Sequence, residues 1–341
     1  MPEVVVSAPR FASEASTLPY GVSVITREEL AGSGAATVNE ALMRLLGVPG
    51  RADYYGGGEY NLDLRGFGTT AGSNQVVVLD GIRLNEVDLG GTRLSGLSVN
   101  DVERIEVLRG SGAVLYGEAA TAGVIVITTR AGQGTARRNA AAVEAQAGSY
   151  GFRSARGSAT LVAGGFSMDV SAGERRSDNH RDNFHSDQKA NRVQVQWSND
   201  WLRLGLGHAQ DDLETGLPGA ISLAQFAANP TQVTAFNTQT TAQIANRRDT
   251  LMLQAEMGAW QLALDAGQRS KQLDSLNKGV STYLYDIDAS SLALRARHSA
   301  RWGQMANALT LGVDDQRWES TVPGGFGSVA GQTSRAAYAQ N

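Results

Sequence analysis

The fold of this chain is constrained most by residues 101–130, which read DVERIEVLRGSGAVLYGEAATAGVIVITTR. Apolar and polar side chains alternate through residues 105–109, as in a strand with one buried face. A glycine-rich turn follows, because glycine allows tight backbone conformations that other residues avoid. The β-branched run 124–129 then has the composition of a second strand. From its residues alone, the stretch predicts a small α+β domain.

Helix starts are predicted where Ser or Thr is followed three residues later by an acidic residue, as in a capping box. This spacing occurs at Thr26, Thr37 and Ser98. The helix after Thr37 should end at Gly47 and turn one apolar face into the core. We expect that face to consist of Val38, Ala41, Leu42, Leu45 and Leu46.

The order of residues in the first stretch resembles the end of the plug domain of TonB-dependent outer-membrane receptors. The family pattern is an Arg-Ile-Glu-Val-Leu-Arg-Gly run, then Leu-Tyr-Gly, then a Gly-Val-Ile strand. It matches residues 104–110, 115–117 and 123–125. The chain departs from it at Ser111, where the family usually has proline, and at residues 121–122, where it usually has Ile-Gly. Both departures fall in turns and leave the predicted fold unchanged.

Two further segments carry the same resemblance. Residues 62–68 match the Leu-Arg-Gly-Phe signature of family plugs and predict a strand that ends in a glycine turn. Residues 76–85 match their valine run, Asp-Gly turn and Arg-Leu-Asn motif. The resemblance is strong over residues 19–132 and looser after them.

From residue 137 onward, apolar and polar residues alternate along the chain. About ten strands are predicted, joined alternately by short turns and long polar loops, a pattern typical of outer-membrane barrels. A soluble β-sandwich shows the same alternation, and the plug-like segment in front favours the barrel. The predicted strands are residues 143–148, 154–163, 166–174, 192–197, 201–207, 250–258, 260–267, 291–299, 309–318 and 335–340.

The resemblance implies an α+β plug domain followed by antiparallel transmembrane β-barrel strands. We expect a TonB box and linker in residues 1–17, the plug in residues 18–132 and a partial barrel in residues 133–341. Plugged barrels of this kind have about 22 strands and need well over about 400 residues for strands and loops. We therefore expect an incomplete 22-strand barrel, the N-terminal part of a truncated receptor.

Composition excludes several other classes of protein. The 30 basic and 34 acidic side chains form no long block, so the chain has no electrostatic footprint for nucleic acid. It has no cysteine for a disulfide or a thiolate metal site. It also lacks a Gly-x-Ser-x-Gly elbow, a Walker phosphate loop and a His-Glu-x-x-His motif. We therefore expect no enzyme activity, no cofactor and no metal site.

A short extended segment ahead of the plug corresponds, by resemblance, to the TonB box of the family. By itself it reads as a frayed strand or an aggregation-prone tail. The box is offered to TonB, which works with the inner-membrane energising complex. Its physical mode would be β-strand addition, in which backbone hydrogen bonds supply the affinity. The residues implied in TonB binding are Glu3, Val4, Val5, Val6, Ser7 and Ala8.

Residues 51–60 and 86–95 are polar, glycine-bearing loops, which by resemblance are the plug apices that face the extracellular cavity. The first sets three tyrosines around three glycines, and tyrosine offers apolar area and a hydroxyl at low entropy cost. An ordinary flexible, solvated loop is the alternative for each. The predicted ligand-binding residues are Tyr54, Tyr55, Tyr60, Asn85, Asp88 and Arg93.

Arg65 and Arg109 each stand just before a glycine at the end of a predicted strand. The matching arginines of the family lie between plug and barrel and pair with barrel glutamates. A buried guanidinium needs such a partner, because an unpaired buried charge is strongly destabilising. Surface arginines are the alternative, and we predict plug–barrel contacts for both.

Two loops between the predicted strands allow further predictions. Residues 177–188 carry aspartates that are compatible with a calcium site, but no EF-hand spacing is present, and a solvated polar loop is favoured. In residues 211–246, Ser222 should cap a short helix that ends at residues 229–230. This second loop resembles an extracellular loop of ferric-siderophore receptors.

Together, these resemblances imply energy-coupled uptake of a scarce metal chelate across the Gram-negative outer membrane, without covalent chemistry. The predicted substrate is a ferric siderophore, and the predicted partners are TonB, the chelate and outer-membrane lipid. Cobalamin uptake is the alternative within the family, favoured by residues 81–85. A β-rich binding or adhesion module that transports nothing is the alternative outside it.

Overall fold

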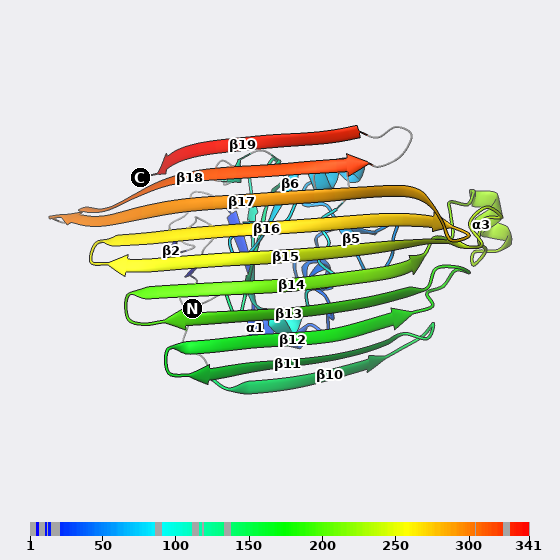
Figure 1. Ribbon diagram of the computed structural model, residues 1–341, viewed down its shortest axis with the longest axis horizontal. Helices are drawn as coiled ribbons and strands as arrows, with labels where there is room; N and C mark the ends of the chain where they lie inside the picture. Colours follow the sequence, from blue (N-terminus) through cyan, green and yellow to red (C-terminus); the bar gives the residue numbers. More distant parts are fainter. Residues whose placement is uncertain are drawn as a thin grey trace.

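The computed structural model describes residues 5–6, 11, 13–14, 21–85, 91–110, 116–117, 119–132, 138–303, 305–322 and 328–340. Its largest element is a ten-stranded antiparallel sheet, in which the strands follow one another in chain order from β10 to β19. A smaller α+β domain, blue and cyan in Figure 1, lies against one face of this sheet. The chain thus has the predicted order of a small α+β domain followed by antiparallel strands.

A five-stranded mixed sheet forms the centre of the small domain, with the strand order β3-β8-β9-β6-β7. Strands β6 and β9 run parallel, and the other pairs are antiparallel. Every residue of β6 is buried, as expected of an apolar strand covered on both faces. The strands are β3 (Gly21–Thr26), β6 (Gln75–Leu79), β7 (Ile82–Arg83), β8 (Val102–Arg109) and β9 (Gly123–Thr129).

Two helices of this domain start where the capping boxes predict them, α1 (Arg27–Gly32) and α2 (Val38–Leu46). Thr26 and Glu29 close the full reciprocal box at the start of α1. Helix α2 ends at Gly47, which has a φ of 61°. Glycine adopts this left-handed conformation without the steric cost of a Cβ.

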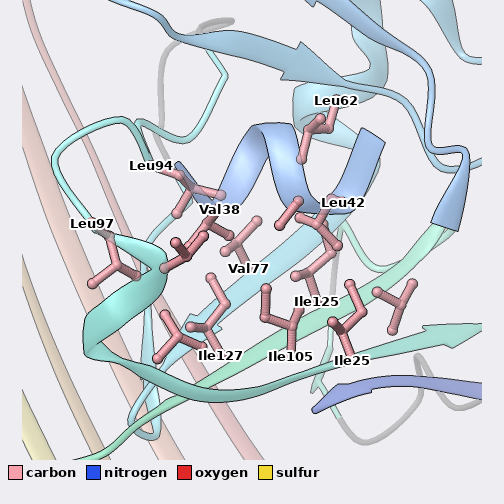
Figure 2. Close-up of a cluster of buried hydrophobic side chains, with 14 of the residues drawn as sticks. Ile25, Val38, Leu42, Leu62, Val77, Leu94, Leu97, Ile105, Ile125 and Ile127 are labelled. Carbon is pink, nitrogen blue, oxygen red and sulfur yellow. The ribbon is translucent and has the colours of Figure 1, made fainter. Parts of the chain in front are cut away.

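The core of the small domain lies between α2 and the five-stranded sheet (Figure 2). Val38 and Leu42 of the helix face Ile105 and Ile125 of the sheet. The predicted burial of Leu45 is wrong, because its side chain is 39% exposed. In the last turn of α2, the neighbouring leucine at position 46 packs against the core instead.

Ser98 caps a single 3-10 turn, η3 (Val99–Asp101), and not an α-helix. The carboxylate of Asp101, the second member of the predicted box, pairs with Arg156 of the large sheet. It is therefore not available to close a capping box at Ser98. The other short elements are β1 (Val5–Val6), β2 (Ser13–Glu14), β4 (Gly50–Ala52), β5 (Tyr60–Leu62) and η2 (Gly68–Ser73).

The large sheet contains ten strands, as alternation predicts, but most of them are longer than expected. The predicted loop over residues 211–246 is shortened to residues 217–239, and α3 (Leu223–Ala228) begins after Ser222 as predicted. The strands are β10 (Ala140–Ala147), β11 (Arg153–Ala163), β12 (Phe166–Ser177), β13 (Ser186–Ser198), β14 (Leu202–Gly216), β15 (Thr240–Met257), β16 (Trp260–Asn277), β17 (Val280–Trp302), β18 (Met305–Val322) and β19 (Ser328–Gln340).

Much of the extra strand length lies where the outer face of the sheet becomes polar. On β14, Leu204 and Leu206 are exposed on the face opposite the small domain. Farther along the same face stand His208 and Asp212. Apolar–polar alternation stops there, although the backbone pairing continues through the whole strand. Periodicity alone therefore finds only the apolar part of each strand.

Among the described residues, no helix is long and apolar enough to cross a membrane.

Candidate ligand-binding site

The first predicted apex, residues 51–60, is a hairpin between β4 and β5. Its tip is formed by the three glycines at residues 56–58, with φ of 64°, 67° and 73°. A Cβ on the middle one, Gly57, would lie 2.9 Å from the side chain of Leu213 on β14. The hairpin tip is therefore seated against the large sheet, and only glycine combines this backbone with this close approach.

Tyr54 and Tyr55 stand on this hairpin with their rings edge to face, at a centroid distance of 5.4 Å and an interplanar angle of 84°. Tyr54 is 57% exposed. Tyr55 packs instead against a buried cluster of the large sheet that includes Leu273. Burial, followed by the charge of Asp53, raises the pKa of Tyr55 to about 12. At neutral pH, Tyr55 is uncharged and anchors the hairpin to the sheet. The ring of Tyr54 is exposed to solvent.

Two further tyrosines come from the large sheet, Tyr283 and Tyr285 on β17, with ring centroids 5.6 Å apart. Tyr283 is exposed and lies close enough to Tyr55 to influence its pKa. We call Tyr54, Tyr55, Tyr283 and Tyr285 the aromatic cluster. Our sequence analysis missed the last two, because it predicted no strand over residues 280–290. Their two-residue spacing on one face of a strand is the signal that could have found them.

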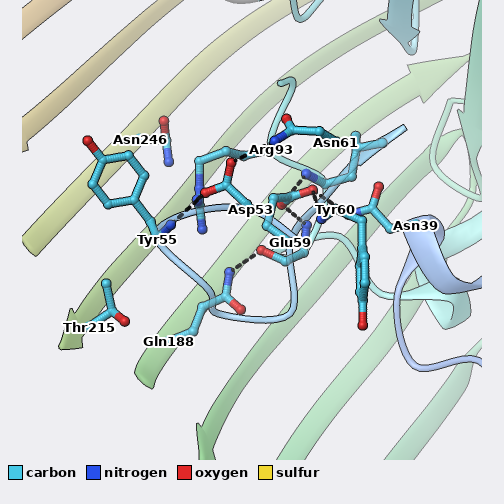
Figure 3. A network of polar contacts seen from close by, with 12 residues as sticks. Asn39, Asp53, Tyr55, Glu59, Tyr60, Asn61, Arg93, Gln188, Thr215 and Asn246 are labelled. Atoms are coloured by element: carbon cyan, nitrogen blue, oxygen red, sulfur yellow. Dashed lines mark hydrogen bonds and ion pairs between the residues drawn. The ribbon is translucent and has the colours of Figure 1, made fainter. Parts of the chain in front are cut away.

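A polar network connects the tyrosine hairpin with the second predicted apex (Figure 3). The carboxylate of Asp53 accepts hydrogen bonds from the backbone N–H of Tyr55 at 2.9 Å and from Asn61 Nδ2 at 3.1 Å. It also lies 4.0 Å from a guanidinium nitrogen of Arg93, whose side chain is only 6% exposed. Arg93 is thus brought next to the tyrosine hairpin, but it is buried there beside a carboxylate.

Glu59 connects the same two loops from below. Its Oε2 accepts the backbone N–H groups of Leu94 and Ser95, both at 2.8 Å. Its Oε1 accepts the N–H of Tyr60 at 3.3 Å and a hydrogen bond from Asn39 Nδ2. Burial raises the pKa of this carboxyl group above its usual value, although the neighbouring guanidinium and the hydrogen bonds act against that rise. Our sequence analysis did not single out Glu59.

Not all predicted ligand residues lie on this surface. Tyr60 packs against the core of the small domain. The amide of Asn85 is used inside the domain, since its oxygen accepts from Val77 N at 2.8 Å and its nitrogen donates to the Gln75 carbonyl at 2.5 Å. Asp88 lies outside the described residues. Ligand contact by any of the predicted residues stays a prediction.

The predicted TonB-binding segment is described only at Val5 and Val6, which form β1 and pair with β2. The other residues of the prediction, Glu3, Val4, Ser7 and Ala8, lie outside the described residues.

Arg65 is exposed, and Arg109 donates a 2.8 Å hydrogen bond to Ser23 Oγ within the small domain. Among the described residues, neither arginine forms an ion pair with the large sheet. Their predicted contacts with the barrel stay a prediction.

The turn after β5 is organised by Asp63. Its carboxylate accepts backbone hydrogen bonds from Gly66 at 2.7 Å, Phe67 at 3.0 Å and Gly68 at 2.8 Å. Burial acts to raise its pKa, but the backbone donors hold the pKa of Asp63 below its usual value. The predicted glycine turn is present, but the strand before it ends at Leu62 and does not continue through residues 63–65, because the chain folds around this carboxylate.

Arginines of the large sheet bind acceptors on the small domain. Arg192 donates to Asp80 at 2.7 Å, and Arg156 pairs with Asp101. Arg269 donates at 2.7 and 2.8 Å to two backbone carbonyls of the small domain. These contacts run in the opposite sense to the predicted ones, with cations on the sheet. An arginine on the inner face of an alternating strand is the signal that could have found them.

Residues 177–188 do not form a solvated loop throughout, because β13 begins at Ser186. Arg181 is held by backbone carbonyls of the loop between β14 and β15, and Asp187 pairs with Arg176 at 2.9 Å. Within the part of the chain that the structure describes, no group of three His, Cys, Asp or Glu residues is placed to hold a metal ion. The described residues of the site offer aromatic rings, hydroxyls and hydrogen-bonding groups for recognition.

The family model that matches the chain is the TonB-dependent receptor plug domain, over residues 14–124. The chain is 36% identical over 162 residues to the vitamin B12 transporter BtuB of Photobacterium profundum, which covers 48% of this chain and 25% of that protein. It is 38% identical over 128 residues to the vitamin B12 transporter BtuB of Vibrio cholerae, which covers 38% of this chain and 20% of that protein. The chain thus spans at most about a quarter of the length of these curated relatives.

Solved structures share the fold. The unliganded ferric citrate transporter FecA matches with a TM-score of 0.79 and 19% identity, over 95% of this chain and 54% of that one. FpvA of Pseudomonas aeruginosa with a bound pyoverdine–iron complex matches with a TM-score of 0.75 and 14% identity, over 99% and 51%. The alcaligin receptor FauA of Bordetella pertussis matches with a TM-score of 0.74 and 11% identity, over 98% and 54%.

At these identities the solved structures establish the fold alone, which is a plug domain followed by barrel strands. The plug model assigns residues 14–124 to the plug-domain family of TonB-dependent receptors. The strands after the plug share the fold of solved outer-membrane receptors.

Proposed function

We propose that this chain serves the TonB-dependent uptake of a scarce metal chelate, a ferric siderophore first of all, across the Gram-negative outer membrane. The observation that carries the proposal is the aromatic cluster. It joins Tyr54 and Tyr55 of the plug to Tyr283 and Tyr285 of the sheet. Exposed tyrosines supply ring surface for stacking and hydroxyls for hydrogen bonds at low entropy cost.

The position of the cluster supports this function. Tyr283 lies close to the turn between β16 and β17, and that end of the sheet also carries the loop with α3 (Figure 1). The β12–β13 and β14–β15 connections at this end are longer than the two- or three-residue turns at the opposite end, as in outer-membrane barrels whose longer loops face the outside. A ligand arriving from the medium would meet the tyrosines of both domains. The proposed process is binding followed by gated passage, with no covalent step.

The proposed partner for gating is TonB, bound to residues 3–8 by β-strand addition. Val5 and Val6 pair with Glu14 and Ser13 of β2. Among the described residues this pairing is two residues long, so an incoming strand could replace β2 there at little cost in backbone hydrogen bonds. Binding of TonB would then pull on the chain ahead of β3 and loosen the plug.

Cobalamin is the second candidate substrate. The sequence relatives that match at 36% and 38% identity are vitamin B12 transporters. Tyrosine rings also suit the large, partly apolar surface of a corrinoid. A receptor for either ligand would use the same aromatic cluster, so the two candidates differ in the ligand and not in the location of the site.

The test is equilibrium binding to the receptor in detergent, with ferric catecholate, ferric hydroxamate, ferric citrate and cyanocobalamin as separate probes. One probe class should bind, and Tyr54→Ala and Tyr55→Ala should each weaken it by about tenfold or more, as expected for a buried or stacked aromatic anchor. Phe166→Ala removes an exposed ring on the outer face of the sheet and is the matched control. Full affinity in both tyrosine variants would remove the aromatic cluster from the site. Binding of none of the probes would favour an adhesion module.

A further inference from the structure

Glu59 lies beneath the proposed binding surface, and its side chain is 2% exposed. Four N–H donors from three separate parts of the plug converge on its carboxylate. They are the backbone groups of Tyr60 in β5 and of Leu94 and Ser95 in the second apex, and the side-chain amide of Asn39 in α2. A single carboxylate therefore joins both apices to the helix below them.

The donors fit the ionised form of this group. All four partners donate, and an ionised carboxylate only accepts. A proton on either oxygen would point at an N–H group and displace at least one of the bonds. Hydrogen bonds to a charged acceptor are also stronger than those to a neutral one. The arrangement of the two apices is therefore coupled to the charge of Glu59.

The charged groups around Glu59 come from several elements. On its own hairpin stands Asp53, and on the second apex stands Arg93. From the sheet, the side chain of Arg175 on β12 lies directly against the hairpin backbone at residue 58. Asp211 on β14 is linked through Gln188, whose amide donates to it at 2.7 Å and to Ser95 Oγ at 2.9 Å.

We propose that Glu59 is a positioning residue, and that its ionised carboxylate holds the two plug apices together as one ligand-binding surface. Protonation of Glu59 loosens the apices from each other and from α2. The inference deepens the proposed function, on which it rests for its meaning in ligand binding. The hydrogen bonds themselves are present without ligand and can be measured separately.

The pH at which the two apices loosen depends on the burial of Glu59. Because burial raises the pKa of Glu59, the group takes up a proton at a higher pH than an exposed glutamate does. Mild acidification should therefore reach Glu59 before it reaches the exposed carboxylates of the plug. Ligand affinity should fall over the same pH interval.

The test is amide hydrogen exchange of the ligand-free receptor in detergent, followed at Leu94 and Ser95 after correction for the intrinsic pH dependence of exchange. The Glu59→Gln variant keeps the shape of the side chain but replaces one acceptor by a donor. It should speed exchange at these two amides by about tenfold or more, as expected for loss of a hydrogen bond to a charged group. It should also remove the acid-induced loss of protection seen in the unmodified protein. Glu28→Gln, at an exposed site on α1, is the matched control.

A second variant, Asn39→Ala, tests the proposal even if Glu59→Gln does not fold. Asn39→Ala removes one donor and keeps the carboxylate, so protection at Leu94 and Ser95 should drop less than in Glu59→Gln and keep its pH dependence. Wild-type exchange in Glu59→Gln, or an unchanged pH profile, would overturn the proposal. Altered exchange without binding of any chelate would keep the positioning role and overturn only the proposed function.

Discussion

Asp80 of the plug accepts a 2.7 Å hydrogen bond from Arg192 of strand β13 in the large sheet. The same carboxylate accepts the backbone N–H of Thr129 at 2.8 Å and its hydroxyl at 2.7 Å. The side chains of Arg192 and Asp80 are 15% and 12% exposed, so the pair is mostly shielded from water. One carboxylate thus fixes the end of β9 and attaches the plug to the sheet.

The Asp80→Asn variant should weaken this attachment. It removes the charge that faces Arg192, and breaking a buried ion pair costs up to about 3–5 kcal/mol. Partial exposure should reduce the loss to about 1–3 kcal/mol. We expect the plug to unfold at lower denaturant concentration and to become more sensitive to protease. Asp315→Asn is the control, because its arginine partners are well exposed and exposed ion pairs contribute little to stability. Equal stability of the two variants would contradict the prediction.

The Gly57→Ala variant should displace the tyrosine hairpin. The φ of 67° strains any residue with a Cβ, and the new Cβ would lie 2.9 Å from Leu213. Strain and overpacking together should cost about 2–4 kcal/mol. The expected result is a lower unfolding temperature together with a weaker ligand affinity.

The matched control for this variant is Gly164→Ala, where φ is 56° but no atom lies within 4 Å of the new Cβ. It has the backbone strain without the clash, at about 1–2 kcal/mol. If both variants bind ligand equally well, then the seating of the hairpin on Leu213 does not matter for the site.

A structural feature could be predicted from the sequence where residues close together in the chain determine it. It could not be predicted where it depends on a contact that forms only in the folded chain. The starts of α1 and α2 follow from Thr26 and Thr37, because a cap and its helix are local. The turn after Leu62 begins earlier than predicted, since an apolar pattern does not show that the Asp63 carboxylate accepts hydrogen bonds from the backbone around it. Local signals thus give the elements but not every boundary.

The residues of the candidate site also fall into those that the sequence predicts and those that only the tertiary structure reveals. Tyr54 and Tyr55 could be predicted because three tyrosines and three glycines stand together in one loop. Tyr283 lies more than half the chain away in sequence and meets them only after the sheet has formed. Glu59 looks like any polar loop residue until the second apex brings its two N–H groups to the carboxylate. Contacts of this long-range kind need the tertiary structure.

The ionisation of Tyr55 should set a pH limit on stability. Its pKa is raised from the ordinary tyrosine value of 10.0 to about 12 in the folded protein. A raised folded-state pKa means that the folded state holds the proton more tightly than the unfolded state. Its stabilising contribution is complete below about pH 10 and is lost as the pH rises through about 12. An ultraviolet titration of phenolate should show a late-titrating tyrosine that is absent from Tyr55→Phe. Loss of an early-titrating tyrosine in that variant would contradict the burial of this ring.

Val5→Pro should separate ligand binding from transport. Proline has no backbone N–H and disrupts strand pairing at that position. If residues 3–8 bind TonB by strand addition, uptake should fall by about tenfold or more, because part of the backbone ladder is lost. The equilibrium affinity for the chelate should stay unchanged, since the aromatic cluster is formed by other residues. Uptake of labelled ligand by cells and binding to the purified receptor are the two measurements.

The control for this variant is Val5→Ala, which keeps the backbone donor and removes most of the side chain. Strand addition depends mainly on the main chain, so Val5→Ala should transport at close to the unmodified rate. Loss of uptake in both variants would indicate that TonB recognises the valine side chain. Normal uptake in Val5→Pro would refute the assignment of residues 3–8 as the TonB-binding segment. Val5 and Val6 pair with β2, so the proline should also weaken this pairing. If the plug of the proline variant is as stable as that of the unmodified protein, β1 serves recognition by TonB and not the stability of the plug.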